Sequence, residues 1–355
     1  MEECKMKKGL ALLLTVMAMG LSVGCGNSQS ANTSNSTTET ATEGTTAEGA
    51  GTVSTETTTA SEETKTIAIV QYVEHPSLDT IRESIIKELG NEGYIEGQNL
   101  VIDYQKAQAD QSNLNTIASK FVGENVDLII AIATPAAQAM AAATSDIPVV
   151  FSAVTDPVGA KLVEDLNKPS ANVTGTSDAI PVDQTFELCK ELTPDVKKIG
   201  FLYTASEVNS QSVIEEAKTL AKDYGFEFEE STITNSSELQ QAAEILAGKV
   251  DAIYTPIDNG IAAAMPVLAD VCKTAGIPAY VGADSMVADG GYATVGINYE
   301  DLGVKTAEMT AQILNGTPIS EIPVATLDHF YKVINKTTAT AIGAPADAEG
   351  ATIVE

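Results

Sequence analysis

The chain has 355 residues, 44% of them hydrophobic, and its 49 acidic and 20 basic side chains give a formal net charge of −29. This composition excludes a wholly disordered chain, and the negative charge argues against nucleic acid as a partner because the surface repels phosphate. The length favours two domains. Arg82 is the only arginine, so an anionic ligand must be held without the usual guanidinium clamp.

The N-terminal segment has the pattern of an export signal. Three lysines precede an apolar run that ends at Cys25, which predicts a signal peptide over residues 1–24. The stretch LSVGC resembles a bacterial lipobox, although its leucine lies one place further from the cysteine than in the commonest form. We therefore expect Cys25 to be lipidated; the alternative is an ordinary secretory signal with an incidental cysteine. Met6 is an alternative start.

Residues 25–64 are almost wholly Ser, Thr, Asn, Ala, Gly, Gln and Glu, without apolar periodicity. Such a segment buries too little apolar surface to offset its ordering entropy. We expect a disordered tether, followed by a folded region that begins near Lys65.

Strands and helices alternate in two series along the rest of the chain. Short β-branched runs alternate with segments whose apolar residues recur at helical spacing. The first series has strands at 66–70, 100–104, 127–133 and 148–153 and helices at 77–89, 112–122 and 135–143. The second has strands at 198–203, 227–232, 251–255 and 279–282 and helices at 210–224, 237–246 and 262–275. This alternation predicts βαβ units with parallel sheets.

The two series repeat one pattern. VDLIIAIATPAAQAM at 126–140 corresponds to VDAIYTPIDNGIAAAM at 250–265, and an Ile-Pro pair follows each. We interpret this as a duplication that builds two similar α/β lobes with a ligand cleft between their strand ends; the alternative is similarity of βαβ composition alone. The expected lobes are residues 65–180 plus about 290–318, and 181–289 plus about 319–345.

No catalytic or metal-binding motif is present. A triad of His75, Ser77 and Asp79 is rejected because three residues so close along a loop and helix start would not converge on one carbonyl. The cysteines and histidines lie at spacings that suggest neither a disulfide framework nor a metal site: Cys4, Cys25, Cys189, Cys272, His75 and His329. We expect a protein without cofactor or metal, with Cys189 and Cys272 as buried apolar side chains.

Polar residues at the predicted strand ends are candidates for binding a ligand. On the first lobe, Thr134 and Pro135 predict a capped helix start whose backbone N–H groups would hold a carboxylate. The neighbouring candidates on this rim are Ala136, Ala137, Ser152, Thr155 and Asp156. The alternative is that Thr134 is simply a helix cap.

The second lobe offers a matching rim. Asp258 could pair with a ligand ammonium group, or it could be a helix cap that needs no ligand. The other candidates here are Asn259, Ser206 and Asn209. Tyr72 and Tyr203 lie at strand ends and could face a planar ligand or belong to the core.

Several motifs resemble the ABC-transporter substrate-binding family that includes bacterial tryptophan-binding lipoproteins. They include QYVEHPSLD, IATPAAQA, FSAVTDPVGAKLVEDLNKPSANVTGTSD, VDAIYTPIDN and NYEDLGVKTAEM, and the resemblance spans about residues 65–343. It implies a periplasmic-binding-protein fold of the first type, three crossings between the lobes and hinge closure on the ligand. It also implies that His75, Ser77 and Asp178 contribute to the site. Asp284 stands where this branch would have a neutral residue.

The resemblance implies an extracytoplasmic receptor, not an enzyme, that is anchored to the membrane by lipid and delivers a small molecule to an ABC permease and its ATPase. An aromatic amino acid such as tryptophan is the expected ligand. The open alternatives are another solute (a nucleoside, a sugar or a different amino acid) and a cell-surface enzyme.

Overall fold

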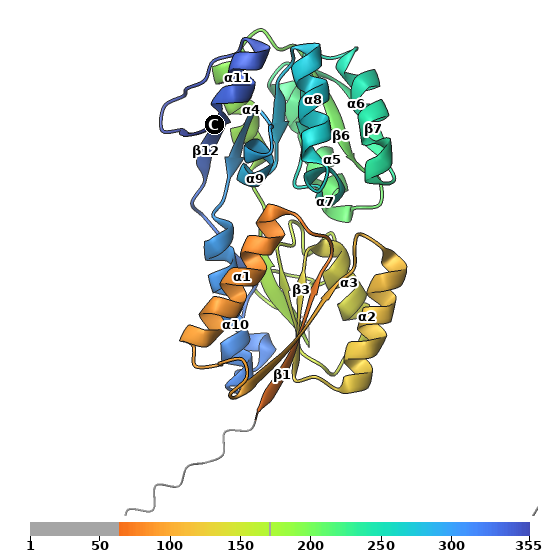
Figure 1. Ribbon diagram of the computed structural model, residues 1–355, viewed down its shortest axis with the longest axis vertical. Coiled ribbons are helices and arrows are strands. Elements are labelled where there is room, and N and C mark those ends of the chain that lie inside the picture. The colour runs from red at the N-terminus through yellow and green to blue at the C-terminus, as the bar shows by residue number, and fades with distance from the viewer. Residues whose placement is uncertain (1–63, 170–171) are drawn as a thin grey trace, which may run out of the picture. The chain divides into compact units, whose positions relative to one another are not determined.

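The structure, a computed structural model, describes residues 64–169 and 172–355 (Figure 1). The predicted signal peptide, Cys25 and nearly all of the predicted tether lie outside these residues. No helix in the described part of the chain is long and apolar enough to span a bilayer.

The first lobe is built on a parallel sheet. Within the described residues it has six strands in the order β11-β5-β4-β3-β1-β2. They are β1 (Lys65–Gln71), β2 (Leu100–Lys106), β3 (Leu128–Ile132), β4 (Val149–Ser152), β5 (Val173–Ser177) and β11 (Ala325–Thr326). Helices cover both faces, so β1 and β3 are almost wholly buried and read as continuous apolar runs.

Four helices flank this sheet: α1 (Pro76–Asn91), α2 (Gln111–Glu124), α3 (Thr134–Ala143) and α10 (Tyr299–Leu314). Figure 1 shows α1 beside α10 and α2 beside α3 on opposite sides of the strands. The α1–α10 contact depends on Gly303, where a Cβ atom would lie 2.6 Å from Ser84 Cβ and 2.7 Å from the Ile81 carbonyl oxygen. The two backbones therefore approach more closely than a side chain at residue 303 would allow.

The second lobe has its own sheet, with seven described strands in the order β13-β12-β10-β9-β8-β6-β7. Only β10 and β12 pair in an antiparallel manner among them. The strands are β6 (Lys198–Thr204), β7 (Glu227–Ile233), β8 (Ala252–Thr255), β9 (Ala279–Val281), β10 (Ala293–Gly296), β12 (Tyr331–Asn335) and β13 (Thr352–Val354).

The helices of the second lobe are α4 (Val182–Leu192), α5 (Val208–Asp223), α6 (Leu239–Ala247), α7 (Asn259–Ala262), α8 (Met265–Ala275), α9 (Asp284–Ala288) and α11 (Lys336–Ile342). The 3₁₀ turn η1 (Ser236–Glu238) precedes α6, and a second 3₁₀ turn, η2 (Ile319–Glu321), lies in the segment of the first lobe that leads to β11. Phe186 anchors the core of this lobe through edge contacts to Tyr254 and Phe226. Cys189 and Cys272 are buried and free, as expected.

The chain crosses between the lobes three times, at residues 178–181, 297–298 and 327–330. The Tyr331 hydroxyl joins the second and third crossings, since it donates toward the Ile297 carbonyl oxygen at 2.8 Å. It also lies 2.9 Å from Asp284 Oδ2. The expected fold, two α/β lobes with a parallel sheet in each, is confirmed.

Two segments lie in the lobe opposite to the one expected. Residues 290–297 were assigned to the first lobe, but β10 pairs with β9 and β12 in the second sheet. The buried Tyr292 explains this, because its ring packs edge-on against Tyr280 at 5.5 Å. Residues 319–326 were assigned to the second lobe, but β11 pairs with β5, and Thr174 donates to the Ile322 carbonyl oxygen.

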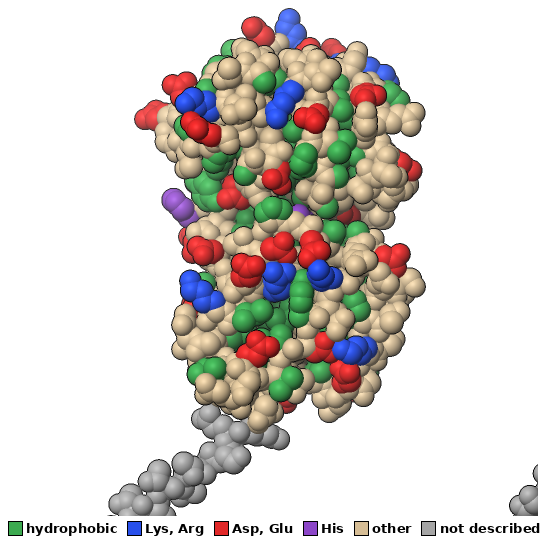
Figure 2. Space-filling model, in the orientation of Figure 1, with side chains coloured by type: hydrophobic (Ala, Val, Ile, Leu, Met, Phe, Trp, Pro, Cys, Tyr) green, Lys and Arg blue, Asp and Glu red, His purple; other side chains and the backbone are tan. Residues whose placement is uncertain are grey.

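Acidic and basic side chains are mixed on the surface. On the face shown in Figure 2, lysine and arginine side chains lie among aspartates and glutamates over both lobes. The described residues include ion pairs such as Arg82–Asp79 and Lys106–Glu74. Neither lobe shows a basic surface on this face that would suit nucleic acid.

Candidate ligand-binding site

Loops from both lobes enclose a cavity at the carboxyl ends of the parallel strands, which is where open α/β sheets bind ligands. The first lobe and its crossings contribute His75, Ser77, Leu78, Ala153, Thr155, Asp178 and Tyr299. The second lobe contributes Asn209, Ile257, Asn259, Ala262, Ala283 and Met286. The cavity has a volume of about 10 Å³, enough for about one water molecule. A larger ligand can therefore enter only if the lobes move apart.

A second cavity of about 10 Å³ adjoins the first, with Thr155 and Ile257 in both walls. Its walls are mainly apolar: Ile180, Val213, Tyr254, Gly282 and Val295, with Thr185 as a further polar member. A polar compartment and an apolar compartment thus lie side by side along the contact between the lobes.

Unpaired polar atoms are concentrated in the polar cavity. Among the described residues, five buried side-chain nitrogen or oxygen atoms lack a well-formed hydrogen bond. Three of them belong to residues that line this cavity: His75 Nδ1, Asn209 Oδ1 and the Tyr299 hydroxyl, which lies near Ser77. Buried polar groups are rarely left unpaired, and each one costs free energy. Their clustering indicates that this cavity is built to meet a polar molecule.

Two side-chain hydrogen bonds join the lobes beside the cavity. The hydroxyls of Ser77 in α1 and Ser285 in α9 are 2.6 Å apart. His75 Nε2 lies 3.4 Å from Asn259 Oδ1. Burial lowers the pKa of His75 to about 4, although the bond to Asn259 and the charge of Asp79 act in the opposite direction. His75 is therefore neutral near pH 7 in this arrangement of the lobes.

Asp258 is held by its own lobe. Its carboxylate accepts hydrogen bonds from the Thr204 amide and hydroxyl at 2.6 and 2.7 Å, the Ser210 hydroxyl at 2.7 Å and the Ile261 amide at 2.9 Å. It is fully buried and caps α7. The geometry thus favours the helix-cap alternative over a direct role with a ligand ammonium group.

Glu207 is a second buried acid in this lobe. It accepts from the Asn259 amide and side chain at 3.1 and 2.6 Å, the Gly260 amide at 3.0 Å and the Asn209 side chain at 3.1 Å. Burial and the nearby Asp258 raise its pKa above the ordinary range. Its role is to fix the loop that carries Asn259 and the side chain of Asn209.

Six of the residues predicted from the sequence line the polar cavity: His75, Ser77, Thr155, Asp178, Asn209 and Asn259. Tyr72 is buried but does not line the cavity. Burial raises the pKa of Tyr72 to about 12, with smaller contributions from the charges of Glu207 and Asp258. Its hydroxyl donates to the Ala109 carbonyl oxygen at 3.4 Å.

Other predicted residues have different surroundings. Ser152 belongs to the first-lobe core, where its hydroxyl lies 2.8 Å from that of Thr306 in α10. The Tyr203 hydroxyl donates to Glu230 on the neighbouring strand β7. Asp156 accepts from the Gly159 amide, and Ser206 is exposed. None of the four lines either cavity.

Thr134 does not occupy the N-cap position that the sequence predicts for it. Helix α3 begins at Thr134, so Ala133 occupies the N-cap position with φ 80°. Thr134, Ala136 and Ala137 are buried and Pro135 is partly buried, and none of them lines either cavity. The Thr134 hydroxyl is unpaired. A threonine inside the first turn cannot cap the helix in the expected way.

Tyr299 is a cavity residue that the sequence analysis missed. Asn298 caps α10 by accepting from the Glu300 and Asp301 amides, so Tyr299 is the first residue of the helix. The sequence N-Y-E-D carries this capping signal. The cap at Asn298 places Tyr299 at a crossing, next to the cleft.

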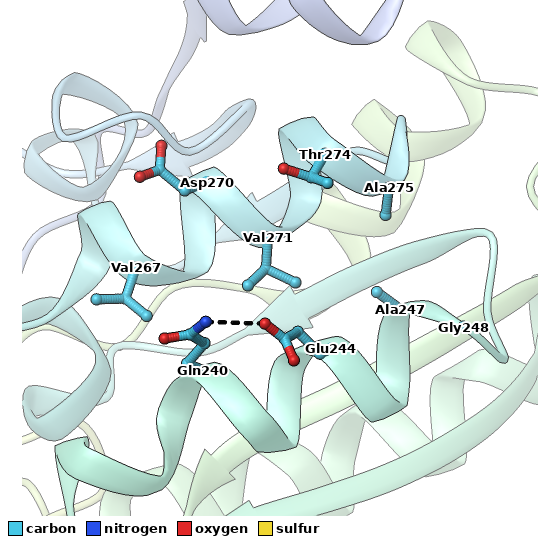
Figure 3. Close-up of a pocket in the computed structure, with 9 residues that line it drawn as sticks. All are labelled: Gln240, Glu244, Ala247, Gly248, Val267, Asp270, Val271, Thr274 and Ala275. Carbon is cyan, nitrogen blue, oxygen red and sulfur yellow. Dashed lines mark hydrogen bonds between the residues drawn. The ribbon is translucent and has the colours of Figure 1, made fainter.

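A larger surface groove lies outside the cleft, between α6 and α8 (Figure 3). It has a volume of about 630 Å³ and lies on the second lobe alone. Gln240 donates to Glu244 at 2.9 Å on its wall. None of the unpaired buried atoms belongs to a residue that lines it. The cavity between the lobes is therefore the better candidate for a specific ligand site.

Comparison with known proteins gives a consistent match. Residues 66–346 match the family model described as ABC transporter substrate binding protein. A curated tyrosine-binding protein of Clostridioides difficile (strain R20291) is 42% identical over 339 residues, which cover 95% of this chain and 93% of that protein.

Solved structures match over the whole of the folded region. The ABC domain in complex with L-Trp from Streptococcus pneumonia is 40% identical, with a TM-score of 0.79 over 82% of this chain and 100% of that one. The ligand-free, open structure of a substrate-binding protein with adhesive properties from Clostridium difficile is 43% identical, with a TM-score of 0.64 over 82% of this chain and 99% of that one.

Proposed function

The chain belongs to the ABC transporter substrate-binding protein family, whose members are binding proteins rather than enzymes, and on this premise we propose that it captures an aromatic amino acid between its lobes. It then presents this ligand to an ABC permease and its ATPase on the extracytoplasmic side of the membrane. The proposal rests on one observation above all: a polar cavity with unpaired His75, Asn209 and Tyr299 atoms adjoins an apolar cavity.

The two compartments fit the two halves of an aromatic amino acid. The charged amino and carboxylate groups need hydrogen-bond partners, which the polar cavity supplies. The ring needs apolar walls, and Ile180, Val213 and Val295 provide them in the neighbouring cavity. The relatives that bind tyrosine and L-tryptophan support this ligand class.

Hinge motion follows from the small size of both cavities. Neither can admit an amino acid unless the lobes separate. At nearly equal identity, the TM-score is higher against the L-tryptophan complex than against the ligand-free, open structure. This difference supports a ligand cycle in which the open form admits the amino acid and the closed form, resembling the one described here, retains it.

A thermal-shift screen of the folded region tests the ligand class. Amino acids, nucleosides and sugars would each be added to protein that has been unfolded and refolded to remove any bound solute. L-Tyrosine, L-tryptophan and L-phenylalanine should raise the melting temperature, because a ligand at about 100 times its Kd adds about 2.7 kcal/mol to stability. A nucleoside or a sugar that stabilises the protein more than every aromatic amino acid would contradict the proposal.

We also propose that the mature protein is lipid-anchored at Cys25, after removal of residues 1–24, which places the folded lobes at the outer face of the membrane. The support is the lipobox-like sequence and the polar segment that follows it. Cys25→Ala should move the protein from the membrane fraction to the soluble fraction. The control, Cys189→Ala, should leave the protein in the membrane fraction. If Cys25→Ala protein from which the signal peptide has been removed stays in the membrane fraction, the proposed lipid anchor is contradicted.

A further inference from the structure

We propose that Asp178 is the counter-ion of the ligand's α-ammonium group and restricts the site to ligands that carry a free amino group. This inference rests on the proposed function, because it assigns a role within the same cavity. It also moves the expected ammonium partner away from Asp258.

The position of Asp178 is the first support. It follows β5 at the first crossing between the lobes, lines the polar cavity and is 1% exposed. Neither Glu207 nor Asp258 lines this cavity, although both are buried nearby. Of these three acids, Asp178 alone faces the space into which a ligand would come.

The hydrogen bonds of the three acids also distinguish Asp178 from Glu207 and Asp258. Asp258 and Glu207 each accept four hydrogen bonds from donors of the second lobe. Asp178 receives one side-chain hydrogen bond, from the Thr155 hydroxyl at 2.9 Å, and a hydrogen bond from its own backbone amide. No ion pair to Asp178 is formed within residues 64–169 and 172–355.

A buried carboxylate without a cation is unfavourable. Burial raises the pKa of Asp178 to about 6, against the effect of its two hydrogen bonds. Isolated buried charges carry a large desolvation penalty, which an opposite charge in contact relieves. The ammonium group of an amino acid supplies this charge, and the cavity offers no lysine or arginine that would compete for it.

The opposite wall supplies a second acceptor. Asn209 Oδ1 is buried, unpaired and part of the same cavity, while the Asn209 amide nitrogen donates to Glu207 and to the Ile257 carbonyl oxygen. Its oxygen is therefore held in place by the second lobe. An ammonium group has three N–H donors, so it can bond to Asp178 and Asn209 together and join the two lobes. A ligand without the amino group would leave both acceptors unpaired in the closed form.

The test compares L-tyrosine with its desamino analogue, 3-(4-hydroxyphenyl)propionate, by calorimetry at pH 7.5. The proteins are the wild type, Asp178→Asn and the exposed control Asp146→Asn. We expect the wild type and the control to bind L-tyrosine about 100-fold more tightly than the analogue. Asp178→Asn should weaken L-tyrosine binding by about 30-fold or more. The same substitution should leave the affinity for the analogue unchanged or raise it.

The other outcomes separate this inference from the proposed function. An equal loss for both ligands in Asp178→Asn, or a wild type that binds the analogue as tightly as L-tyrosine, would overturn the role of Asp178 and leave the ligand class intact. A wild type that binds neither ligand, and also neither L-tryptophan nor L-phenylalanine, would overturn the proposed function and this inference with it. Because Asp178→Asn keeps the shape and removes a buried charge, its ligand-free melting temperature should equal or exceed that of the wild type. A large fall would show a structural role instead.

Discussion

Asp178 and Asp258 are both buried aspartates beside the cleft, and their hydrogen bonds separate their roles. The sequence places Asp258 after a predicted strand, whereas Asp178 enters the candidate site only through the family resemblance. Residue type and spacing alone could not distinguish a helix cap from a ligand contact. Only the four donors around Asp258 and the single side-chain donor at Asp178 do so. The sequence thus predicted the rim of the site, and folded geometry was needed to assign roles on it.

Asp258→Ala should therefore lower the stability of the ligand-free protein. The change leaves buried N–H and O–H donors of residues 204, 210 and 261 without their acceptor, at a cost of about 2–4 kcal/mol. Chemical denaturation would measure the loss. Asp270→Ala, on an exposed part of α8, is the matched control and should stay within about 0.5 kcal/mol of the wild type. Unchanged stability with weakened amino-acid binding would favour a direct ligand role for Asp258.

His75 should make ligand retention dependent on pH. In the closed arrangement its pKa is lowered to about 4 by burial, whereas a solvated histidine in the open form has a pKa of about 6.5. The closed form is therefore fully favoured above about pH 6.5 and loses stability relative to the open form as the pH falls toward about 4.

We expect the affinity for L-tyrosine to fall by about tenfold or more between pH 7.5 and pH 5, with a shallower fall in His75→Gln. Part of the fall should remain in that variant, because protonation of Asp178 also weakens its pairing with a cation. Calorimetry across this range would test the effect. His329→Gln, which replaces an exposed histidine, should keep the wild-type slope. A His75→Gln slope as steep as that of the wild type would contradict the role of His75.

At the scale of elements, the alternation of strands and helices was predictable because most strands are apolar and β-branched. Strand β5 is the exception: VTGTS resembles a loop in composition, and it was not predicted. Its polar side chains are buried because they have partners, with Thr174 bonded to the Ile322 carbonyl oxygen and Thr176 to the Thr306 hydroxyl. These partners lie more than a hundred residues away, so no local pattern could reveal them.

The contact between α1 and α10 gives a prediction at this scale. Gly303→Ala should destabilise the protein by about 1–3 kcal/mol, because the new Cβ would collide with Ser84 and with the Ile81 carbonyl oxygen. The usual preference of a helix for alanine over glycine would give the opposite sign. Gly90→Ala in α1, where nothing lies within 4 Å of the added Cβ, is the control and should be neutral or stabilising. Equal melting temperatures for the two variants would contradict this packing.

At the scale of the whole molecule, the duplicated sequence predicted two lobes, and the three crossings allow them to move as units. The lobe boundaries were less predictable, since β10 and β11 are short strands whose sheet is decided by long-range pairing. Small-angle scattering of the folded region should show a smaller radius of gyration with saturating L-tyrosine than after removal of ligand. An unchanged radius would argue against closure.

The central claim is that the two lobes enclose one aromatic amino acid. Calorimetric titration of the refolded, ligand-free protein with L-tyrosine, L-tryptophan and L-phenylalanine tests it most directly. We predict one site per chain for at least one of them, with a negative heat-capacity change because the ring leaves water for the apolar cavity. A correctly folded protein that gives no binding heat with any of the three at several temperatures would contradict the account.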